Sequence, residues 1–349
     1  MMKKTFDNPD DAFEELDEAT SEADLWFLPP EPELDDLDLY PAARQPRADL
    51  PLFPLAEWRA AEADLAADLA GLSYDFGRLE ERLKLAGEGV RRRLALQEVS
   101  SLGWWMGDRV AVDRLGLWIS MQIGATGLDV QALGRGAWAV RRLLSGPAPV
   151  GEGAEAALMV LLGVPEGSQV PDRVRDAADM LEVMAPLHQV TRGAILFHLW
   201  RQTGSTPAHD LEAAVLAARL AGQMAGEHAF MPISLAGFGA LQGRGSAAQR
   251  LAGWIAGSHQ AVLAALMHLD RLAAWQQRAS RLTGDLSGRT PPLLLSLLAE
   301  WPSLSAPMAE QGTGASRAAV QRNLDILERR GLIRELTGQG RYRVWAAQL

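Results

Sequence analysis

The chain of 349 residues contains no cysteine, which excludes a disulfide scaffold, thiolate metal sites, iron–sulfur clusters and cysteine nucleophiles. Lysine is scarce: it occurs only at Lys3, Lys4 and Lys84, so no phosphate-binding loop ending in Gly-Lys can follow residue 84. No run approaches the roughly 18 apolar residues that a membrane span needs. Acidic residues follow Met-Met-Lys-Lys where a signal peptide requires an apolar run, so a cytoplasmic protein without membrane contact is expected.

Charge is distributed unevenly along the chain. Residues 1–50 contain 15 Asp and Glu against 4 Lys and Arg, a net charge of −11, whereas the whole chain carries −10. The acidic segment also holds five prolines between Pro29 and Pro46, and such a composition buries too little apolar surface to offset the entropy of ordering. Residues 1–49 are therefore predicted to form an acidic, largely disordered tail.

Residues 50–285 are predicted to form an all-helical domain. Apolar residues recur at steps of three and four over about 50–69, 109–123, 129–144, 152–162, 172–184, 190–202 and 208–228, as on amphipathic helices. A charged helix is predicted from Phe76 to about Gln97, and one long helix from Ser246 to about Leu282. Alternation of apolar and polar residues is absent before residue 330, so the fold class is mainly α.

Residues 286–349 have the pattern of a winged helix-turn-helix domain. Pro291 opens a helix that ends at Trp301, a short helix follows over 305–310, and Ser316 is the predicted N-cap of a third helix that Gly331 stops. Val320, Leu324 and Leu327 fall on one face of that helix. A β-hairpin is predicted after it, from Leu332–Leu336 and Arg341–Trp345.

This order of elements indicates contact with double-stranded DNA. A third helix of this length fits the major groove, where Arg can bridge guanine and Gln can pair with adenine. The hairpin would then lie against phosphates or the minor groove. The predicted DNA-binding residues are Ser316, Arg317, Gln321, Arg322, Thr337, Gln339, Arg341 and Arg343. Winged-helix folds also serve as interaction or dimerisation modules, so the pattern does not by itself decide between these roles.

The segment from Ser305 to Trp345 resembles the terminal module of a bacterial family, often encoded on alphaproteobacterial plasmids, that joins a helical domain to a C-terminal helix-turn-helix. Its wing is also similar to the one that follows many Fic-family domains. Leu94 to Leu144 resembles the opening helices of a Fic-type domain, in which a Ser-Ser pair precedes Ile-Glu-Gly. Here Ser100-Ser101 is followed by Leu-Gly-Trp-Trp, without the glutamate. The resemblance extends over residues 50–285 and implies a Fic-like helical body.

A Fic enzyme uses a His base, a Gly-Asn-Gly anion cradle and an Arg for the nucleotide phosphates. The nearest match is the segment from Leu187 to Gly193, which has His188 and Arg192 but Gln189-Val190-Thr191 between them. A phosphate cradle needs backbone N–H groups held open by small residues. The resemblance therefore implies a catalytically silent domain, with degenerate nucleotidyl transfer as a remaining alternative.

The remaining candidate features are expected to have structural roles and not to form a functional site. No two of the six histidines lie at helical metal-ligand spacing, so no metal site or cofactor is predicted. His268 and Asp270 are expected to form a surface pair, and Arg91-Arg92-Arg93 to lie on a solvated face. Trp104, Trp105, Trp118 and Trp138 are expected to pack in the core. Gly237 to Gly245 is predicted to be a loop, because no strand precedes it.

We therefore expect a transcriptional regulator that binds specific DNA sequences and has a helical body that forms a homodimer. The alternatives from other classes are a protein-interaction adaptor or toxin–antitoxin-type regulator with a silent Fic-like domain, and an enzyme with a degenerate Fic-like site.

Overall fold

The structure is a computed structural model that describes residues 54–121, 129–147, 149, 153–204, 206–226, 229–338 and 343–349. The chain divides into two compact units, Met1–Leu50 and Pro51–Leu349. The predicted acidic tail lies outside the described residues, and the description below concerns the second unit.

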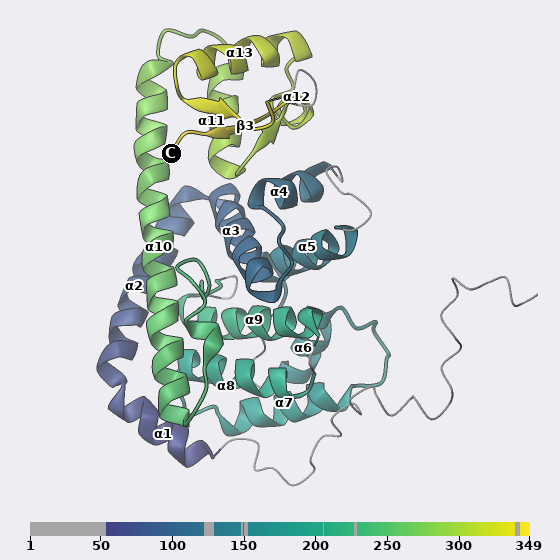
Figure 1. Ribbon diagram of the computed structural model, residues 1–349, viewed down its shortest axis with the longest axis vertical. Helices are drawn as coiled ribbons and strands as arrows, with labels where there is room; N and C mark the ends of the chain where they lie inside the picture. The colour runs from purple at the N-terminus through teal and green to yellow at the C-terminus, as the bar shows by residue number, and fades with distance from the viewer. Residues whose placement is uncertain are drawn as a thin grey trace, which may run out of the picture. The chain divides into compact units, whose positions relative to one another are not determined.

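The described part is mainly helical, as the sequence predicts (Figure 1). Its helices are α1 (Leu55–Asp64), α2 (Ala66–Ala86), α3 (Glu88–Met106), α4 (Val112–Met121), α5 (Val130–Leu144), α6 (Ala154–Leu162), α7 (Asp172–Val183), α8 (Gln189–Gln202), α9 (Pro207–Gly222), α10 (Ala247–Leu282), α11 (Thr290–Glu300), α12 (Ala306–Thr313) and α13 (Arg317–Arg329). Two 3₁₀ turns, η5 (Gln223–Ala225) and η6 (Ala240–Gln242), and three short strands complete them: β1 (Leu304–Ser305), β2 (Ile333–Glu335) and β3 (Val344–Ala347).

The stretch from 76 to 97, predicted to be charged and helical, is helical except for one break, where α2 ends and α3 begins. The break is at Gly87, whose φ is +86°. Residues with a Cβ rarely adopt this conformation, whereas glycine does so at little cost. The glycine therefore redirects the chain although the residues on both sides favour a helix.

Helices α8 and α9 form the centre of the body and are buried along most of their length. Small residues on α9 allow the two helices to approach closely: a Cβ added at Gly193 of α8 would lie 3.1 Å from the Ala217 carbonyl oxygen and 3.1 Å from the Ala221 Cβ. Interiors of this density respond to single methyl groups. The body core thus depends on the alanines and glycines of these two helices.

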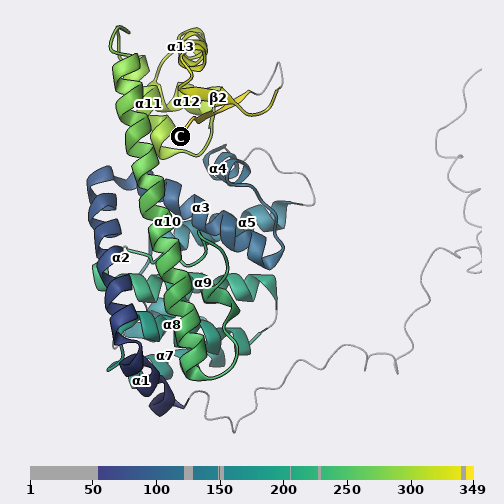
Figure 2. The same cartoon turned by 60° about the vertical axis from the view of Figure 1, so that its left-hand side comes forward.

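Helix α10 runs beside α2 and continues to the C-terminal helices (Figures 1 and 2). It begins with a capping box, in which the Ser246 Oγ accepts from the Gln249 N–H and the Gln249 side chain accepts from the Ser246 N–H. Two side-chain contacts join it to α2: a hydrogen bond of 2.8 Å between His259 Nε2 and Asp75 Oδ2, and an ion pair of 2.8 Å between Arg82 Nη1 and Asp270 Oδ1.

The predicted surface pair of His268 and Asp270 is wrong. Asp270 is paired with Arg82, and His268 is buried against α3, where its Nε2 lies 3.2 Å from the Arg93 Nε. Burial, and then the charge of Arg93, lower the pKa of His268 to about 4. The imidazole is therefore neutral and can accept this hydrogen bond.

The predicted solvated face at Arg91-Arg92-Arg93 is also wrong for two of the three residues. Arg91 and Arg93 are buried, with exposed fractions of 6% and 4%. Arg91 makes two hydrogen bonds, of 2.8 and 3.1 Å, to the buried carboxylate of Glu80. Arg92 stacks on Trp301, with its Cζ 5.0 Å from the ring centroid. A run of arginines lies inside the protein here because each finds a specific partner.

The tryptophan prediction is partly wrong. Trp105, Trp118 and Trp138 are half-buried and pack against the core, but Trp104 is 52% exposed. The guanidinium of Arg109 lies 5.8 Å from the Trp104 ring centroid, so the exposed indole is covered in part by a cation.

The C-terminal elements form three helices and a small antiparallel sheet with strand order β1-β3-β2. Glu335 pairs with Trp345 across β2 and β3, and Leu304 pairs with Trp345 across β1 and β3. Strand β1 was not predicted, because a strand of two residues has no periodicity to detect. The second strand of the hairpin was predicted over Arg341–Trp345, whereas β3 covers Val344–Ala347, and Arg341 and Tyr342 lie outside the described residues.

Candidate nucleic-acid interface

Helix α13 begins and ends where the sequence predicts. The Ser316 Oγ accepts a hydrogen bond from the Ala319 N–H at 3.4 Å, which makes Ser316 the N-cap. Gly331 follows the helix with φ +65°. The predicted inner face is buried and consists of Val320, Leu324 and Leu327, joined by Asn323. The amide of Asn323 donates to the Ala319 carbonyl at 2.8 Å, so this buried polar group is satisfied.

The turn between α12 and α13 is built by Gly314 and Thr313. Gly314 ends α12 in the left-handed conformation, with φ +64°, and its N–H donates to the Glu310 carbonyl at 2.9 Å. The Thr313 hydroxyl donates to the Ala309 carbonyl at 2.6 Å and accepts from the Ala315 N–H at 3.2 Å. These bonds fix the chain direction immediately before α13.

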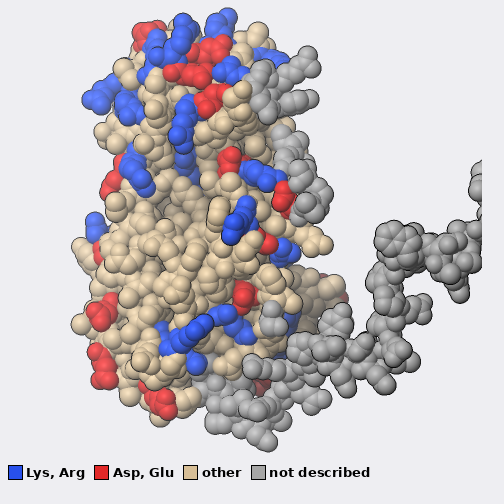
Figure 3. Space-filling view, viewed as in Figure 1, with Lys and Arg blue, Asp and Glu red and all other residues tan. Residues whose placement is uncertain are grey.

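The outer face of α13 carries arginines. Arg317 and Arg322 are exposed, and neither makes an ion pair with another residue in the part of the chain that the structure describes. Arg322 and Arg329 are seven residues apart, which places them on the same side of the helix two turns from each other. In Figure 3, Lys and Arg side chains gather at the end of this unit that carries α13, with acidic side chains among them.

Besides Ser316, which caps α13, three of the predicted contact residues already have partners inside the protein. The Gln321 Nε2 donates to Asp325 Oδ1 at 2.8 Å. The Arg343 Nη2 donates to Glu328 Oε2 at 2.9 Å, and its guanidinium lies 4.9 Å from the Trp345 ring centroid. Arg343 therefore ties the base of the hairpin to α13.

The third residue, Thr337, is bound to Glu335. The Glu335 carboxylate accepts from the Thr337 hydroxyl and from the N–H groups of Thr337 and Gly338. The hydrogen bond from the Thr337 side chain contributes most to a lowered pKa of Glu335. Gln339 and Arg341, also predicted to contact DNA, lie outside the described residues.

The structure adds two arginines that the sequence analysis did not select. Arg329 is exposed on the last turn of α13, and Arg334 is the exposed residue of β2 between Ile333 and Glu335. The period-2 pattern of β2 could have identified Arg334. The exposed arginines Arg317, Arg322, Arg329 and Arg334 thus lie on α13 and on β2, the strand that follows it.

The segment from Leu187 to Gly193, which the sequence analysis compared with a Fic motif, forms the start of α8. The His188 Nδ1 accepts from the Val190 N–H at 3.2 Å and so caps α8, while the His188 N–H donates to the Glu62 carboxylate at 3.0 Å. Thr191 is fully buried, and the buried Arg192 reaches the Leu181 carbonyl at 3.5 Å. The carboxylate of Glu62 thus occupies the position at the start of α8 where an anionic ligand would bind.

A hollow of about 630 Å³ lies beside this helix start. It is lined by Arg59, Glu62, Ala63, Ala66, Leu69, Ala70, Ser73, Pro186, Leu187 and His188. The Ser73 Oγ is 3.4 Å from the His188 Nε2 and donates to the Leu69 carbonyl at 2.7 Å. Because Nδ1 accepts a hydrogen bond, the neutral ring carries its proton on Nε2 and cannot take one from Ser73. The pair is thus not an activated nucleophile.

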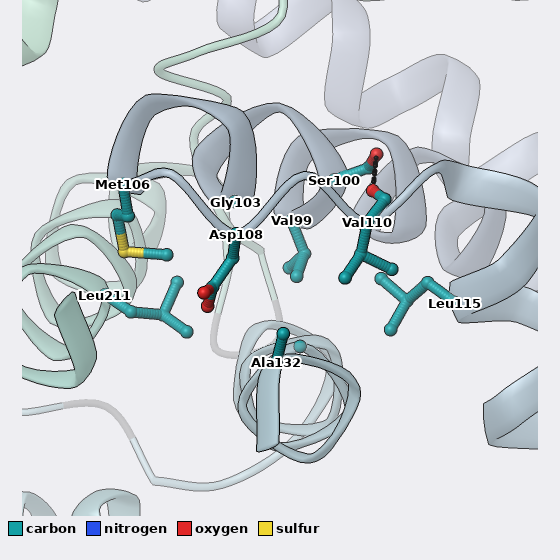
Figure 4. Close-up of a pocket in the computed structure, with 10 residues that line it drawn as sticks. Val99, Ser100, Gly103, Met106, Asp108, Val110, Leu115, Ala132 and Leu211 are labelled. Carbon is teal, nitrogen blue, oxygen red and sulfur yellow. Dashed lines mark hydrogen bonds between the residues drawn. The ribbon is translucent and has the colours of Figure 1, made fainter. Parts of the chain in front are cut away.

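A second cavity, of about 10 Å³, lies between α3, α5 and the start of α4 (Figure 4). This volume holds about one water molecule. Its polar groups are already engaged: the Ser100 hydroxyl donates to the Val110 carbonyl at 2.8 Å, and Asp108 accepts two hydrogen bonds, of 2.8 and 2.9 Å, from Arg135. The cavity is a packing gap and offers no room for a substrate.

Among the described residues, no three His, Asp or Glu side chains come together to hold a metal ion. The described helices also include none with the length and apolar character needed to cross a membrane. Neither a protein-family model nor a curated protein matches the chain.

Proposed function

We propose that this protein binds specific sequences of double-stranded DNA and regulates transcription, with α13 as the recognition helix of a winged helix-turn-helix module. The observation that carries the proposal is the exposure of Arg317 and Arg322 on α13 without an ionic partner among the described residues. The order α11, β1, α12, α13, β2, β3 supports it, since in this class of module the third helix enters the major groove.

The proposed base contacts come from the first turns of α13. Arg322 and Arg317 would donate to guanine O6 and N7, and the exposed Ala318 would leave room for a thymine methyl group. Arg329 and Arg334 would contact phosphates, which position the protein without reading sequence. Gln321 can reach adenine only if its hydrogen bond to Asp325 opens.

We propose further that the protein acts as a homodimer. From Thr313 to the C-terminus the chain carries seven arginines against three acidic residues, a net charge of +4. A single module with so small an excess of charge binds DNA weakly. Two copies of α13, separated by about 34 Å, would address two half-sites in successive turns of the major groove. Sedimentation equilibrium of the full chain tests the dimer, and symmetry in the selected DNA sites tests the half-sites.

The proposal is tested by selecting bound fragments from a random DNA pool and measuring affinity for the enriched sites. The variant Arg317→Ala/Arg322→Ala is expected to lose at least about 30-fold in affinity, since it removes two bidentate base contacts worth about 1–3 kcal/mol each. Arg141→Ala/Arg244→Ala is the matched control, because it also removes two exposed arginines, from the body. Equal losses in both variants, or a pool without enrichment at low salt, would reject the proposal and favour the interaction adaptor.

A further inference from the structure

Arg93 of α3 connects the body to the C-terminal module from inside the protein. Its Nη1 donates to the carbonyl oxygens of Leu298 at 3.0 Å, Ala299 at 3.5 Å and Trp301 at 2.5 Å, and its Nε donates to His268 Nε2 at 3.2 Å. The three carbonyls belong to the end of α11, the first helix of the module, and His268 belongs to α10. One guanidinium therefore joins three helices.

The charge of Arg93 is compensated by the helix end and not by a carboxylate. Its exposed fraction is 4%, and within the described ranges it forms no ion pair. Burial lowers its pKa to about 10. The last carbonyls of a helix lack hydrogen-bond partners within the helix and carry partial negative charge. The positive charge of Arg93 is therefore favourable at the end of α11, and its guanidinium donates hydrogen bonds to these carbonyls.

The module is also attached to α10 and to the turn that follows it. Trp275 Nε1 donates to the Leu332 carbonyl at 2.8 Å, Arg278 donates to the Gln348 carbonyl at 2.5 Å, and Arg330 binds Asp285 with both terminal nitrogens, at 2.6 and 2.8 Å. All three involve α10 or the turn after it.

On its other side the module meets α3 and α4. Arg92 of α3 lies over the Trp301 ring, and the Ser303 hydroxyl donates to the Asp113 carbonyl at 3.3 Å. Two hydroxyl–sulfur contacts with α4, Ser305–Met121 and Ser120–Met308, measure 3.5 and 3.3 Å. The hydrogen bonds from Arg93 to the Leu298 and Trp301 carbonyls, at 3.0 and 2.5 Å, are shorter than these, so Arg93 provides the closest polar contact described on this side.

We infer that Arg93 is a positioning residue that fixes the orientation of the module, residues 290–349, on the helical body. Its buried guanidinium holds the end of α11 against α3 and α10, so that α13 is presented at one angle. The consequence for DNA rests on the proposed function: a dimer with rigidly held modules matches one spacing of half-sites, whereas loosely held modules are oriented correctly for only a fraction of the time.

The inference is tested by a distance measurement that does not involve DNA. The chain lacks cysteine, so Tyr74→Cys on α2 and Gln311→Cys on α12, both exposed, provide the only two sites for spin labels. Pulsed electron resonance is expected to give one narrow distance distribution in the otherwise unchanged chain. Arg93→Met is expected to broaden it, because the end of α11 loses its short hydrogen bonds from α3. The module then keeps its contacts with α10, the stacking of Arg92 on Trp301 and the longer contacts with α4.

Arg91→Met is the matched control: Arg91 lies on the same helix and is also buried, but its partner Glu80 belongs to the body. It should lower stability without broadening the distribution. A narrow distribution in Arg93→Met, or equal broadening in Arg91→Met, would overturn the inference. If Arg93→Met does not fold, Arg93→Lys takes its place under the same criteria, because the single nitrogen of lysine cannot reach His268 and the helix end together.

DNA affinity provides the second readout. If the correctly oriented fraction falls to about one tenth, Arg93→Met loses about tenfold on a two-half-site fragment and little on a single half-site. Equal losses on both fragments would point to unfolding and count against positioning. If no fragment is bound by any variant, the proposed function fails, while the distance measurement still decides the role of Arg93.

Discussion

Two charged side chains of the body, Glu98 and Arg219, are completely buried. Glu98 Oε1 accepts from the N–H groups of Ile233 at 2.9 Å and Ser234 at 3.0 Å, and Arg219 donates to the carbonyls of Ala229 at 3.2 Å and Gly146 at 2.7 Å. Both thus hold the segment that follows α9. Such groups cost free energy to bury unless they are hydrogen-bonded, and here the backbone of an irregular segment supplies the partners.

Glu98 predicts an unusual dependence of stability on pH. Burial raises its pKa to about 7, although the bonds from Ile233 and Ser234 oppose this. A carboxyl group whose pKa is raised on folding stabilises the folded protein most at pH values below the pKa of the unfolded chain. This stabilisation is lost as the pH rises to the folded pKa of about 7. Glu98→Gln keeps an oxygen for both N–H groups and removes the charge. The difference in free energy of unfolding between Glu98→Gln and the parent chain should shift in favour of the variant by about 3 kcal/mol from pH 5 to pH 8.5.

Urea unfolding at the two pH values measures this difference. Glu81→Gln is the control, since Glu81 is 70% exposed and pairs with Lys84 on the surface of α2. Its effect should be small at both pH values. A Glu98→Gln difference that stays the same at pH 5 and pH 8.5 would show that the buried carboxyl does not titrate in this range.

At the scale of elements, the start of α13 depends on a single cap. The Ser316 hydroxyl accepts from the Ala319 N–H, and loss of such a cap costs about 1 kcal/mol. Ser316→Ala should therefore increase amide hydrogen exchange in the first turn of α13, which carries Arg317, and weaken DNA binding several-fold. Ser316→Asn keeps a capping oxygen and should retain both properties. Equal exchange in the two variants would mean that packing, and not the cap, orders this turn.

The elements also differ in how far sequence reasoning could identify them. The limits of α13 were predictable because Ser316, Gly331 and the spacing of Val320, Leu324 and Leu327 are local signals. The hydrogen-bonded strand β1 was not, because its two residues become a strand only by pairing with β3, about 40 residues later. The break at Gly87 was not predictable for a related reason: a single glycine is compatible with a continuous helix, and only the packing of α2 and α3 decides that the chain turns.

At the scale of the whole molecule, the acidic residues near the N-terminus predict an effect on DNA affinity. Removing residues 1–49 changes the net charge of the chain from −10 to +1. The truncated chain should bind its selected site more tightly at low salt, because carboxylates no longer compete with phosphates for the arginines. Above about 0.3 M salt the two chains should converge, as screening shortens the range of charge interactions.

Fluorescence anisotropy titrations at several salt concentrations measure both affinities. If the truncation leaves the affinity unchanged at low salt, the carboxylates of residues 1–49 do not compete with DNA for the arginines. A difference that persists at high salt would indicate a contact that is not electrostatic.

The sequence alone determined the helical class of the body, most helix limits, the charge asymmetry and the arginines of α13, because each follows from neighbouring residues or from composition. The tertiary structure decided which charges are buried. Arg93 meets carbonyls about 205 residues away, Glu98 meets N–H groups 135 residues away, and His268 lies inward beside Arg93 instead of outward beside Asp270. The physical reason is that burial of a charge becomes tolerable only when folding brings distant partners within hydrogen-bond distance, and no local pattern records which partners those are.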